Sequence, residues 1–417
     1  MARPATVGLA TVGRVFTHRN AQVYFGASVL CWTGLWVQRI AVDWLAWEMT
    51  HSPAWVGALV FCGLFPAVIV SPIAGAIADR VDRVRMATIV QFGLAIHSLM
   101  LFTLIATGLM RVELLLVLEF LAGLMQAGQQ PARQSIVPGL VPRSELTGAV
   151  ALNSLTYNLA RFVGPAISGP VVAIWGVMPA IAINVVAGVV TALSMYWLTI
   201  PPEFRTGRAS GKSVIAETIS GFTYIVRHPG MGPLFLFAAV MGLCLRSVPE
   251  MLAPFVARLF ERGADGLAIL ASTMGVAALV GGLLVAMRGR VEGMARVSIG
   301  AGVLLSVATA GFVATNSFEV GVICIALMGA ATTMHGIAAQ TMLQTACAPA
   351  MLGRVMSLWG LIVRAMPASG ALIFGAASSW FGLRVPVLVA MPMALGVCVW
   401  MWFRLPRVAA ALEGPPS

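Results

Sequence analysis

Long apolar runs separated by short basic stretches dominate the pattern of this chain. A helix needs about 20 mainly apolar residues to cross the hydrocarbon core of a bilayer, and windows of that kind recur along the whole sequence. The main intervals without a charged residue are 53–78, 86–110, 162–202, 266–287, 297–318, 320–353 and 385–403. Each predicts a membrane-spanning helix, because a helix satisfies its own backbone hydrogen bonds in lipid.

The interval 162–202 is too long for one crossing, and Gly176 and Pro179 divide it between two helices. Further segments near 20–49, 112–131, 232–257 and 353–380 complete the prediction. The expected fold class is therefore an all-α integral membrane protein with twelve transmembrane helices. A cleavable signal peptide is disfavoured, because the first apolar run is too long and lacks a small-residue cleavage site.

Composition and charge support this class. The 417 residues are 59% hydrophobic and 10% charged, whereas a soluble domain has about 25% charged residues. With the amino terminus inside, most of the 26 Lys and Arg residues fall in cytoplasmic segments, Arg133 among them, as the positive-inside rule requires. The net charge of +11 then reflects basic residues facing an anionic leaflet, and no nucleic acid partner is expected.

The two halves of the chain resemble each other. Arg39-Ile-Ala-Val-Asp43 in the first predicted helix aligns with Arg246-Ser-Val-Pro-Glu250 in the seventh, and Arg161 in the fifth aligns with Arg364 in the eleventh. We therefore expect two six-helix halves, 1–200 and 230–417, joined by a cytoplasmic linker, 201–229. Parallel repeats of this kind are a transporter architecture, with the substrate site between the halves near the bilayer midplane.

Charged residues within the predicted helices are the candidate substrate and proton-coupling residues. A charge at the bilayer centre costs from roughly 2.5 kcal/mol upward, so such residues face the interior and mark function. The candidates are Arg39, Asp43, Glu119, Arg161, Arg246, Glu250 and Arg364.

Two interpretations of these charges stay open. Arg39 and Asp43 share a helix face; they either form a permanent pair, or the carboxylate takes up a proton when substrate draws the arginine away. Glu250 and Glu119 are comparable proton carriers. Arg161 and Arg364 either bond backbone carbonyls or grip carboxylate, phosphate or catecholate groups.

The predicted loop after the second helix reads GAIADRVDRVR over residues 75–85. It resembles the signature of the major facilitator superfamily, with Asp82 where glycine is usual. Together with QRIAVDWLAWEMTHSPAWVG and the run from PARQSIVPG to ARFVGPAISG, it is similar to the enterobactin-exporter and macrolide-efflux branch over nearly the whole chain. The resemblance implies a cytoplasmic latch in which Asp79 meets helix eleven. Its residues would be Gly75, Asp79, Arg80, Arg83 and Arg85, unless the arginines only set topology.

A second motif lies in the fifth predicted helix. Gly164, Pro165 and Gly169 resemble the glycine-proline signature of antiporters in the superfamily, although Pro170 replaces the last glycine. Small residues also let helices approach closely, so tight packing is the alternative interpretation.

The expected function is a secondary active transporter that exports small drug-like or siderophore-like molecules by proton antiport with alternating access. The alternatives are proton-coupled uptake of an organic anion and a membrane-embedded lipid-modifying enzyme; an enzyme is not the expected class. The expected partners are a small-molecule substrate, protons and lipid. The expected form is a monomer in the bacterial inner membrane with both termini cytoplasmic. The six cysteines form no CxxC pair, and the glycine-rich stretch 207–213 has the wrong spacing for a phosphate-binding loop. No metal or cofactor is therefore expected.

Overall fold

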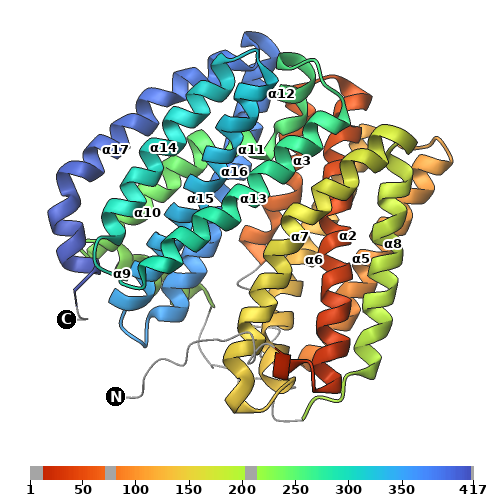
Figure 1. The fold of residues 1–417 in the computed structure, drawn as a ribbon, viewed down its shortest axis with the longest axis horizontal. Coiled ribbons are helices and arrows are strands. Elements are labelled where there is room, and N and C mark those ends of the chain that lie inside the picture. The colour runs from red at the N-terminus through yellow and green to blue at the C-terminus, as the bar shows by residue number, and fades with distance from the viewer. Residues whose placement is uncertain (1–12, 71–80, 202–213, 415–417) are drawn as a thin grey trace. The chain divides into compact units, whose positions relative to one another are not determined.

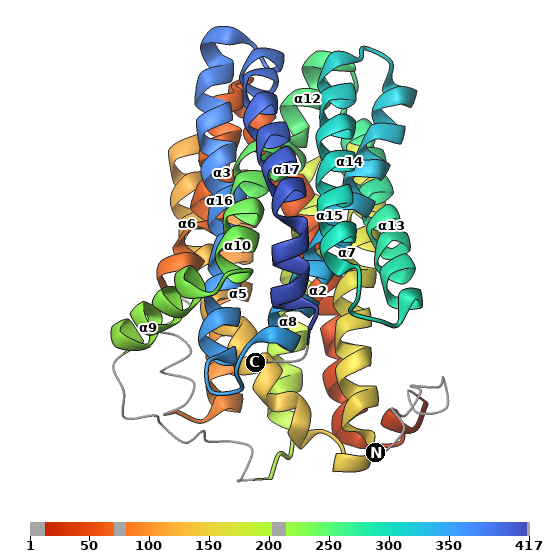
Figure 2. The same cartoon turned by 90° about the vertical axis from the view of Figure 1, so that its left-hand side faces the viewer.

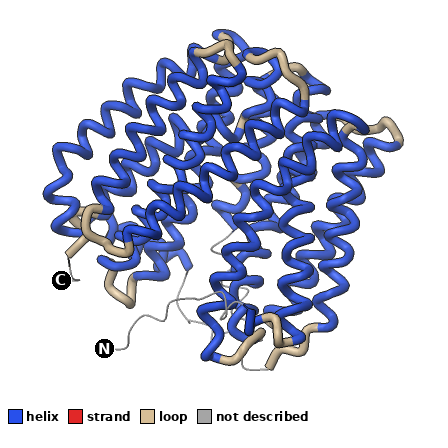
Figure 3. Tube along the Cα trace, viewed as in Figure 1, coloured by secondary structure: helices blue, strands red, loops and turns tan. Residues whose placement is uncertain are grey.

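The computed structural model describes residues 13–70, 81–201 and 214–414. In Figure 3 this part of the chain is helix joined by short loops, and the described residues contain no strand. Ten helices within it are long and apolar enough to cross a membrane. The all-α membrane class is therefore confirmed, and the ten spans are consistent with the predicted twelve.

The chain forms two compact units, and the first comprises 1–42 and 69–210. It contains most of α2 (Arg19–Thr50), which continues into the other unit, and the short helices η1 (Val137–Gly139), η2 (Arg143–Glu145) and η3 (Met195–Trp197). Its long helices are α5 (Arg83–Ala106), α6 (Val112–Ile136), α7 (Leu146–Trp175) and α8 (Val177–Ser194). Helix α5 packs on α6 and α8, and α7 packs on α8. Gly176 has a φ of 79° and separates α7 from α8, where the sequence predicted the division.

The second unit comprises 43–68 and 211–417. Its helices are α3 (Pro53–Leu64), α9 (Val214–Arg227), α10 (Met231–Met241), η5 (Gly242–Arg246), α11 (Ser247–Glu250), α12 (Leu252–Leu259), α13 (Ala264–Arg288), α14 (Met294–Ala314), α15 (Phe318–Ala346), α16 (Leu352–Phe381) and α17 (Arg384–Leu412). Helix α15 packs on α13 and α14, and α17 packs on α14 (Figure 1). The predicted division of the chain at 201–229 stays a prediction.

The seventh predicted helix, near 232–257, is interrupted. The π-helical turn η5 follows α10, and the chain breaks again at Met251, whose φ and ψ are −120° and 39°. Pro249 explains part of this difference, because it has no N–H to donate to the carbonyl four residues earlier. Single π turns often mark functional sites, and η5 ends at the candidate residue Arg246.

Helix α3 packs closely along α16 within the second unit. A Cβ atom on Gly57 would lie 2.3 Å from the carbonyl oxygen of Ala371, and one on Gly375 would lie 2.6 Å from the carbonyl oxygen of Pro53. Because any side chain at either position would meet backbone, glycine is required for this contact. The part of the first predicted half that belongs to the second unit is residues 43–68, which include the end of α2 and all of α3, whereas α5 belongs to the first unit.

Candidate functional site

A tryptophan shared by two arginines lies in the first unit. The guanidinium carbon of Arg39 lies 5.3 Å from the ring centroid of Trp36, and that of Arg161 lies 5.7 Å from the same ring. Trp36 and Arg39 come from α2 and Arg161 from α7. A Cβ atom on Gly164 would lie 2.3 Å from the Cβ of Trp36, so this glycine lets α7 approach the tryptophan. Two predicted features, the arginines within the helices and the glycine motif, therefore meet at one side chain.

Glu119 on α6 lies beside this cluster. Its Oε1 lies 4.0 Å from Nε2 of His97 on α5, and the guanidinium of Arg39 acts on it electrostatically. The His97 residue is 4% exposed, and its ring also forms a hydrogen bond with the Leu118 backbone. The first unit thus brings together Arg39, Arg161 and Glu119, three of the predicted residues, from three helices.

Several polar atoms of this site have no hydrogen-bond partner among the described residues. They are Nε1 of Trp36, Nε of Arg161 and Nε2 of His97, and all three are buried. A buried donor without an acceptor costs about 1–3 kcal/mol. The indole and guanidinium N–H groups are donors only, so an oxygen acceptor from a bound molecule would relieve both.

Polar contacts hold α2 in place next to this cluster. The Asn184 side-chain amide on α8 donates to Oε1 of Gln38 and to Oγ of Ser98, both at 2.9 Å, and Ser168 on α7 donates to the carbonyl oxygen of Val37 at 2.9 Å. A Cβ atom on Gly34 would lie 2.7 Å from Oδ1 of Asn184. Polar networks of this kind favour one packing arrangement. Here the network positions the turn of α2 that carries Trp36.

Arg133 is a buried charge whose surroundings sequence reasoning missed. The prediction placed it in a cytoplasmic segment after the fourth helix, and that side of the membrane stays a prediction. The structure adds that α6 continues to Ile136 and that Arg133 is 3% exposed. Its guanidinium donates to Oγ of Ser28 and, at 3.3 Å, to Sγ of Cys31. The guanidinium carbon also lies 5.3 Å from the ring centroid of Tyr24 and 5.1 Å from that of Trp32. The available signal was its place in PARQ, directly after the apolar run of α6.

A neighbouring amide pair extends the Arg133 cluster. The Gln129 side chain donates to Oε1 of Gln91 at 2.7 Å, and Cys31 donates to the same oxygen at 3.5 Å. Both glutamines are 3% exposed. This pair was not predicted, because uncharged amides do not stand out in an apolar run.

The second unit contains the other predicted charges. Arg246 ends η5, Glu250 ends α11 and Arg364 lies on α16, and all three are half-buried. Arg246 acts electrostatically on His335 of α15, whose Nδ1 lies 2.9 Å from Oγ of Ser298 on α14. The Trp359 ring centroid lies 6.4 Å from that of His335. Helix α16 approaches η5 closely, since a Cβ atom on Gly370 would lie 2.1 Å from the Leu243 carbonyl oxygen.

The remaining predicted residues lie partly outside the described chain. Gly75, Asp79 and Arg80 of the expected latch fall outside the described residues, and Arg83 begins α5. Arg85 is exposed, and its N–H donates to Oδ1 of Asp82 at 3.0 Å. Asp82, the departure from the superfamily pattern, is therefore the N-cap of α5, a position that favours aspartate over most residues.

Asp43 lies one turn after Arg39 on the continuous helix α2, so the two share a face. Within the described ranges, no group of three or more His, Cys, Asp or Glu side chains could hold a metal ion.

Half-buried arginines, an acid and aromatic rings among apolar helices fit a membrane transporter, and the comparisons agree. The profile of the family described as "Transmembrane secretion effector" within the major facilitator superfamily matches residues 15–415, and the chain belongs to this family. This confirms the resemblance seen in the sequence.

Named relatives fall in the predicted branch. The enterobactin exporter of Escherichia coli O1:K1 is 26% identical over 92% of this chain and 90% of its own length. A macrolide efflux protein of Streptococcus pyogenes is 23% identical over 83% of this chain and 86% of its own length. The staphyloferrin A transporter of Staphylococcus aureus is 29% identical over a shorter match, 36% of this chain and 38% of that protein.

A solved structure shows the same fold. The inward-facing, unoccupied structure of a bacterial homologue of the lysosomal transporter Spinster superposes with a TM-score of 0.70 at 16% identity, covering 98% of this chain and all of that one.

Proposed function

We propose that this protein exports small amphipathic molecules by proton antiport, through alternating access of a central site. The family is one of secretion transporters, and two relatives are named for export of enterobactin and efflux of macrolides. A catecholate siderophore or a macrolide-like compound is therefore the substrate class we assign to this chain. We further propose that the protein is a monomer without enzymatic activity in the bacterial inner membrane, with both termini in the cytoplasm.

The observation that carries the proposal is the pair of buried donors at Trp36 and Arg161. An indole N–H and a guanidinium N–H without an acceptor suit an anionic or carbonyl oxygen. The adjacent indole face gives an aromatic or apolar part of the same molecule a surface to pack on. One site thus offers both properties of an amphipathic substrate.

Glu119 is the acid to which we assign the transported proton. Arg39 acts on it electrostatically, and His97 lies 4.0 Å from it, so Arg39 supplies a counter-charge while it remains near. When substrate engages Arg39, the carboxylate loses its counter-charge in an apolar setting and favours the protonated form. Substrate and proton would then bias the protein towards different conformations, which is what antiport requires.

The latch and the second-unit charges complete the proposal. Asp79 with Gly75, Arg80, Arg83 and Arg85 would close the cytoplasmic side. Arg246, Glu250 and Arg364 would offer a second set of polar groups to the substrate. The close contact of Gly164 with Trp36 supports a role of the antiporter-like motif in shaping the site.

Transport by purified variants in proteoliposomes tests the site. Arg161→Gln should lower uptake of a labelled catecholate probe at least tenfold, because a neutral amide cannot replace the guanidinium. Trp36→Phe, which removes only the indole N–H and part of the ring, should have a smaller effect in the same direction. Arg111→Gln is the matched control, since Arg111 is exposed at the start of α6. Wild-type transport by Arg161→Gln at equal expression would remove the site from the account.

A further inference from the structure

Helix α9 presents an apolar face that no part of the described chain covers. Ile219, Phe222 and Val226 are 61%, 61% and 60% exposed. Their spacing of three and four residues places them on one side of the helix, and Ala216 on the same side is also exposed. Large apolar side chains gathered in this way mark a surface that meets another apolar phase.

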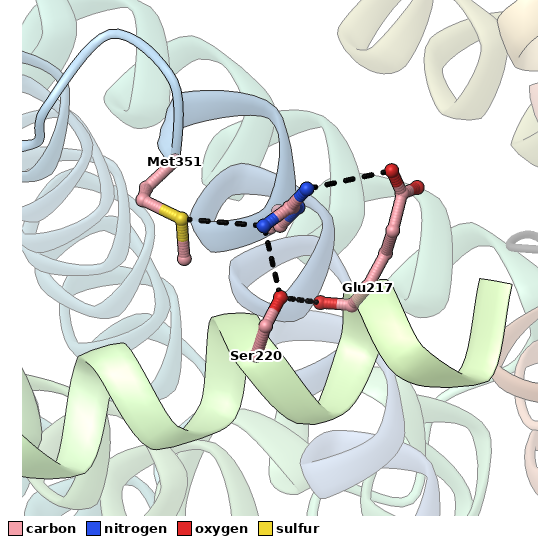
Figure 4. A network of polar contacts seen from close by, with 4 residues as sticks. Glu217, Ser220 and Met351 are labelled. Atoms are coloured by element: carbon pink, nitrogen blue, oxygen red, sulfur yellow. Dashed lines mark hydrogen bonds and ion pairs between the residues drawn. The ribbon is translucent and has the colours of Figure 1, made fainter. Parts of the chain in front are cut away.

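The opposite face of α9 is polar and packs on α16. Arg354 near the start of α16 donates to Oγ of Ser220 at 3.0 Å and lies 3.5 Å from Oε1 of Glu217. Figure 4 shows Glu217 and Ser220 projecting from α9 towards this network, which also includes Met351. Ser220 in turn donates to the Glu217 carbonyl oxygen at 2.8 Å.

This arrangement is the reverse of that in a water-facing helix, where charged groups point outwards and apolar groups point inwards. On α9 the only acid, Glu217, is turned inwards to Arg354, while Ile219, Phe222 and Val226 are exposed. The helix therefore fits an environment that is apolar on its outer side.

The bilayer is the environment within reach. Only residues 228–230 separate α9 from α10, whose first residue, Met231, begins a membrane span. Three residues reach at most about 11 Å when fully extended, and interfacial helices lie about 5–10 Å into the headgroup boundary. Figure 2 shows α9 lying across α10 rather than parallel to it. Arg227, exposed in its last turn, suits anionic headgroups.

We propose that α9 is an interfacial helix that inserts Ile219, Phe222 and Val226 into the cytoplasmic leaflet while Glu217 and Ser220 hold the start of α16. The partner is lipid with anionic headgroups. The helix thereby ties α16, which bears Arg364, to the membrane surface. This inference needs the membrane placement of the chain but neither a substrate nor a coupled ion.

Depth-dependent quenching in lipid nanodiscs tests the proposal on the full-length protein. Phe222→Cys carries an environment-sensitive fluorophore, and Glu292→Cys, in the exposed loop after α13, is the matched control. Acyl-chain spin labels should quench the Phe222→Cys fluorophore several-fold more than the control, and aqueous iodide should do the reverse. Labelled wild-type protein gives the background from native cysteines.

Lipid composition supplies a second measurement. Phosphatidylglycerol in the nanodisc should increase acyl-chain quenching at residue 222. Adding Arg227→Gln should reduce this increase about fivefold, because one basic residue near an anionic surface contributes about 1 kcal/mol to membrane binding. The proposal is overturned if iodide quenches both positions equally. It is also overturned if neither quencher reaches residue 222, because a protein partner or a second copy would then cover the face.

Discussion

Substitution of Gly57 by alanine should open the contact between α3 and α16. The new Cβ would lie 2.3 Å from the Ala371 carbonyl oxygen, against at least about 3.4 Å for ordinary van der Waals contact, so the helices must separate by about 1 Å. Overpacking of this size costs about 1–3 kcal/mol. The better helix propensity of alanine returns up to about 1 kcal/mol, so a net loss of about 1–2 kcal/mol remains.

That loss has a conformational consequence if the protein works by alternating access. A free energy of 1.4 kcal/mol corresponds to a factor of about ten in an equilibrium constant, so the state with α3 packed on α16 should fall by about five- to thirty-fold relative to other states. The effect is on the equilibrium between conformations rather than on substrate contacts, because Gly57 lies away from the Trp36 cluster in sequence and on a different helix.

Pulsed electron paramagnetic resonance measures the distance between nitroxide labels at Ser52→Cys and Ser379→Cys. These positions flank the contact between α3 and α16, so the distance distribution reports this equilibrium. The distance distribution should broaden towards longer values in Gly57→Ala. Gly282→Ala on α13 is the control, because its Cβ would lie 3.5 Å from Ile337 and Thr333, an ordinary contact. An unchanged distribution in Gly57→Ala, with thermal stability equal to that of Gly282→Ala, would refute the reasoning.

Three further predictions concern groups outside the proposed substrate site. Glu413 accepts hydrogen bonds from the backbone N–H groups of Gly293 and Ala295, both at 2.7 Å. Glu413→Gln should therefore lower the free energy of unfolding by about 0.5–2 kcal/mol and lower Tm. The control Glu292→Gln should leave both unchanged. Arg133→Gln should lower the free energy of unfolding by about 2–4 kcal/mol, because it removes two hydrogen bonds from a charged donor and two cation–π contacts. A thermal stability equal to that of the wild type would contradict this prediction.

The last of the three concerns pH. Burial lowers the pKa of His228, and its Nδ1 accepts N–H bonds from Gly230 and Met231. The fold therefore favours the neutral ring. Its stabilising effect is present above the unfolded value of 6.5 and is lost as pH falls through the lower folded value. Tm should fall over this range in wild type and less in His228→Asn; parallel curves would argue against the assignment.

Most helix positions followed from the sequence because an apolar run of about 20 residues is long enough to span the membrane. Gly176 divided α7 from α8 as expected, since a residue with positive φ ends a helix. The interruption of the seventh span was not foreseen. Pro249 was visible in the sequence, but the π turn at 242–246 also depends on how α16 packs against it.

The site was predictable in its residue types and not in its grouping. Charges in apolar segments identified Arg39, Glu119 and Arg161, because each is costly in lipid. That two of them share Trp36 depends on the register of α2 against α7, which no local pattern encodes. The burial of Arg133 was not foreseen, because a basic residue after an apolar run resembles an exposed charge, whereas this guanidinium packs on the rings of Tyr24 and Trp32.

Accumulation of a labelled catecholate or macrolide probe by inverted membrane vesicles with an acidified interior tests the central claim most directly. Proton-driven export through the Trp36, Arg161 and Glu119 site predicts accumulation that a protonophore abolishes and that Glu119→Gln lacks at equal expression. Accumulation that is insensitive to the protonophore, or that appears only when the interior is alkaline, would contradict the account.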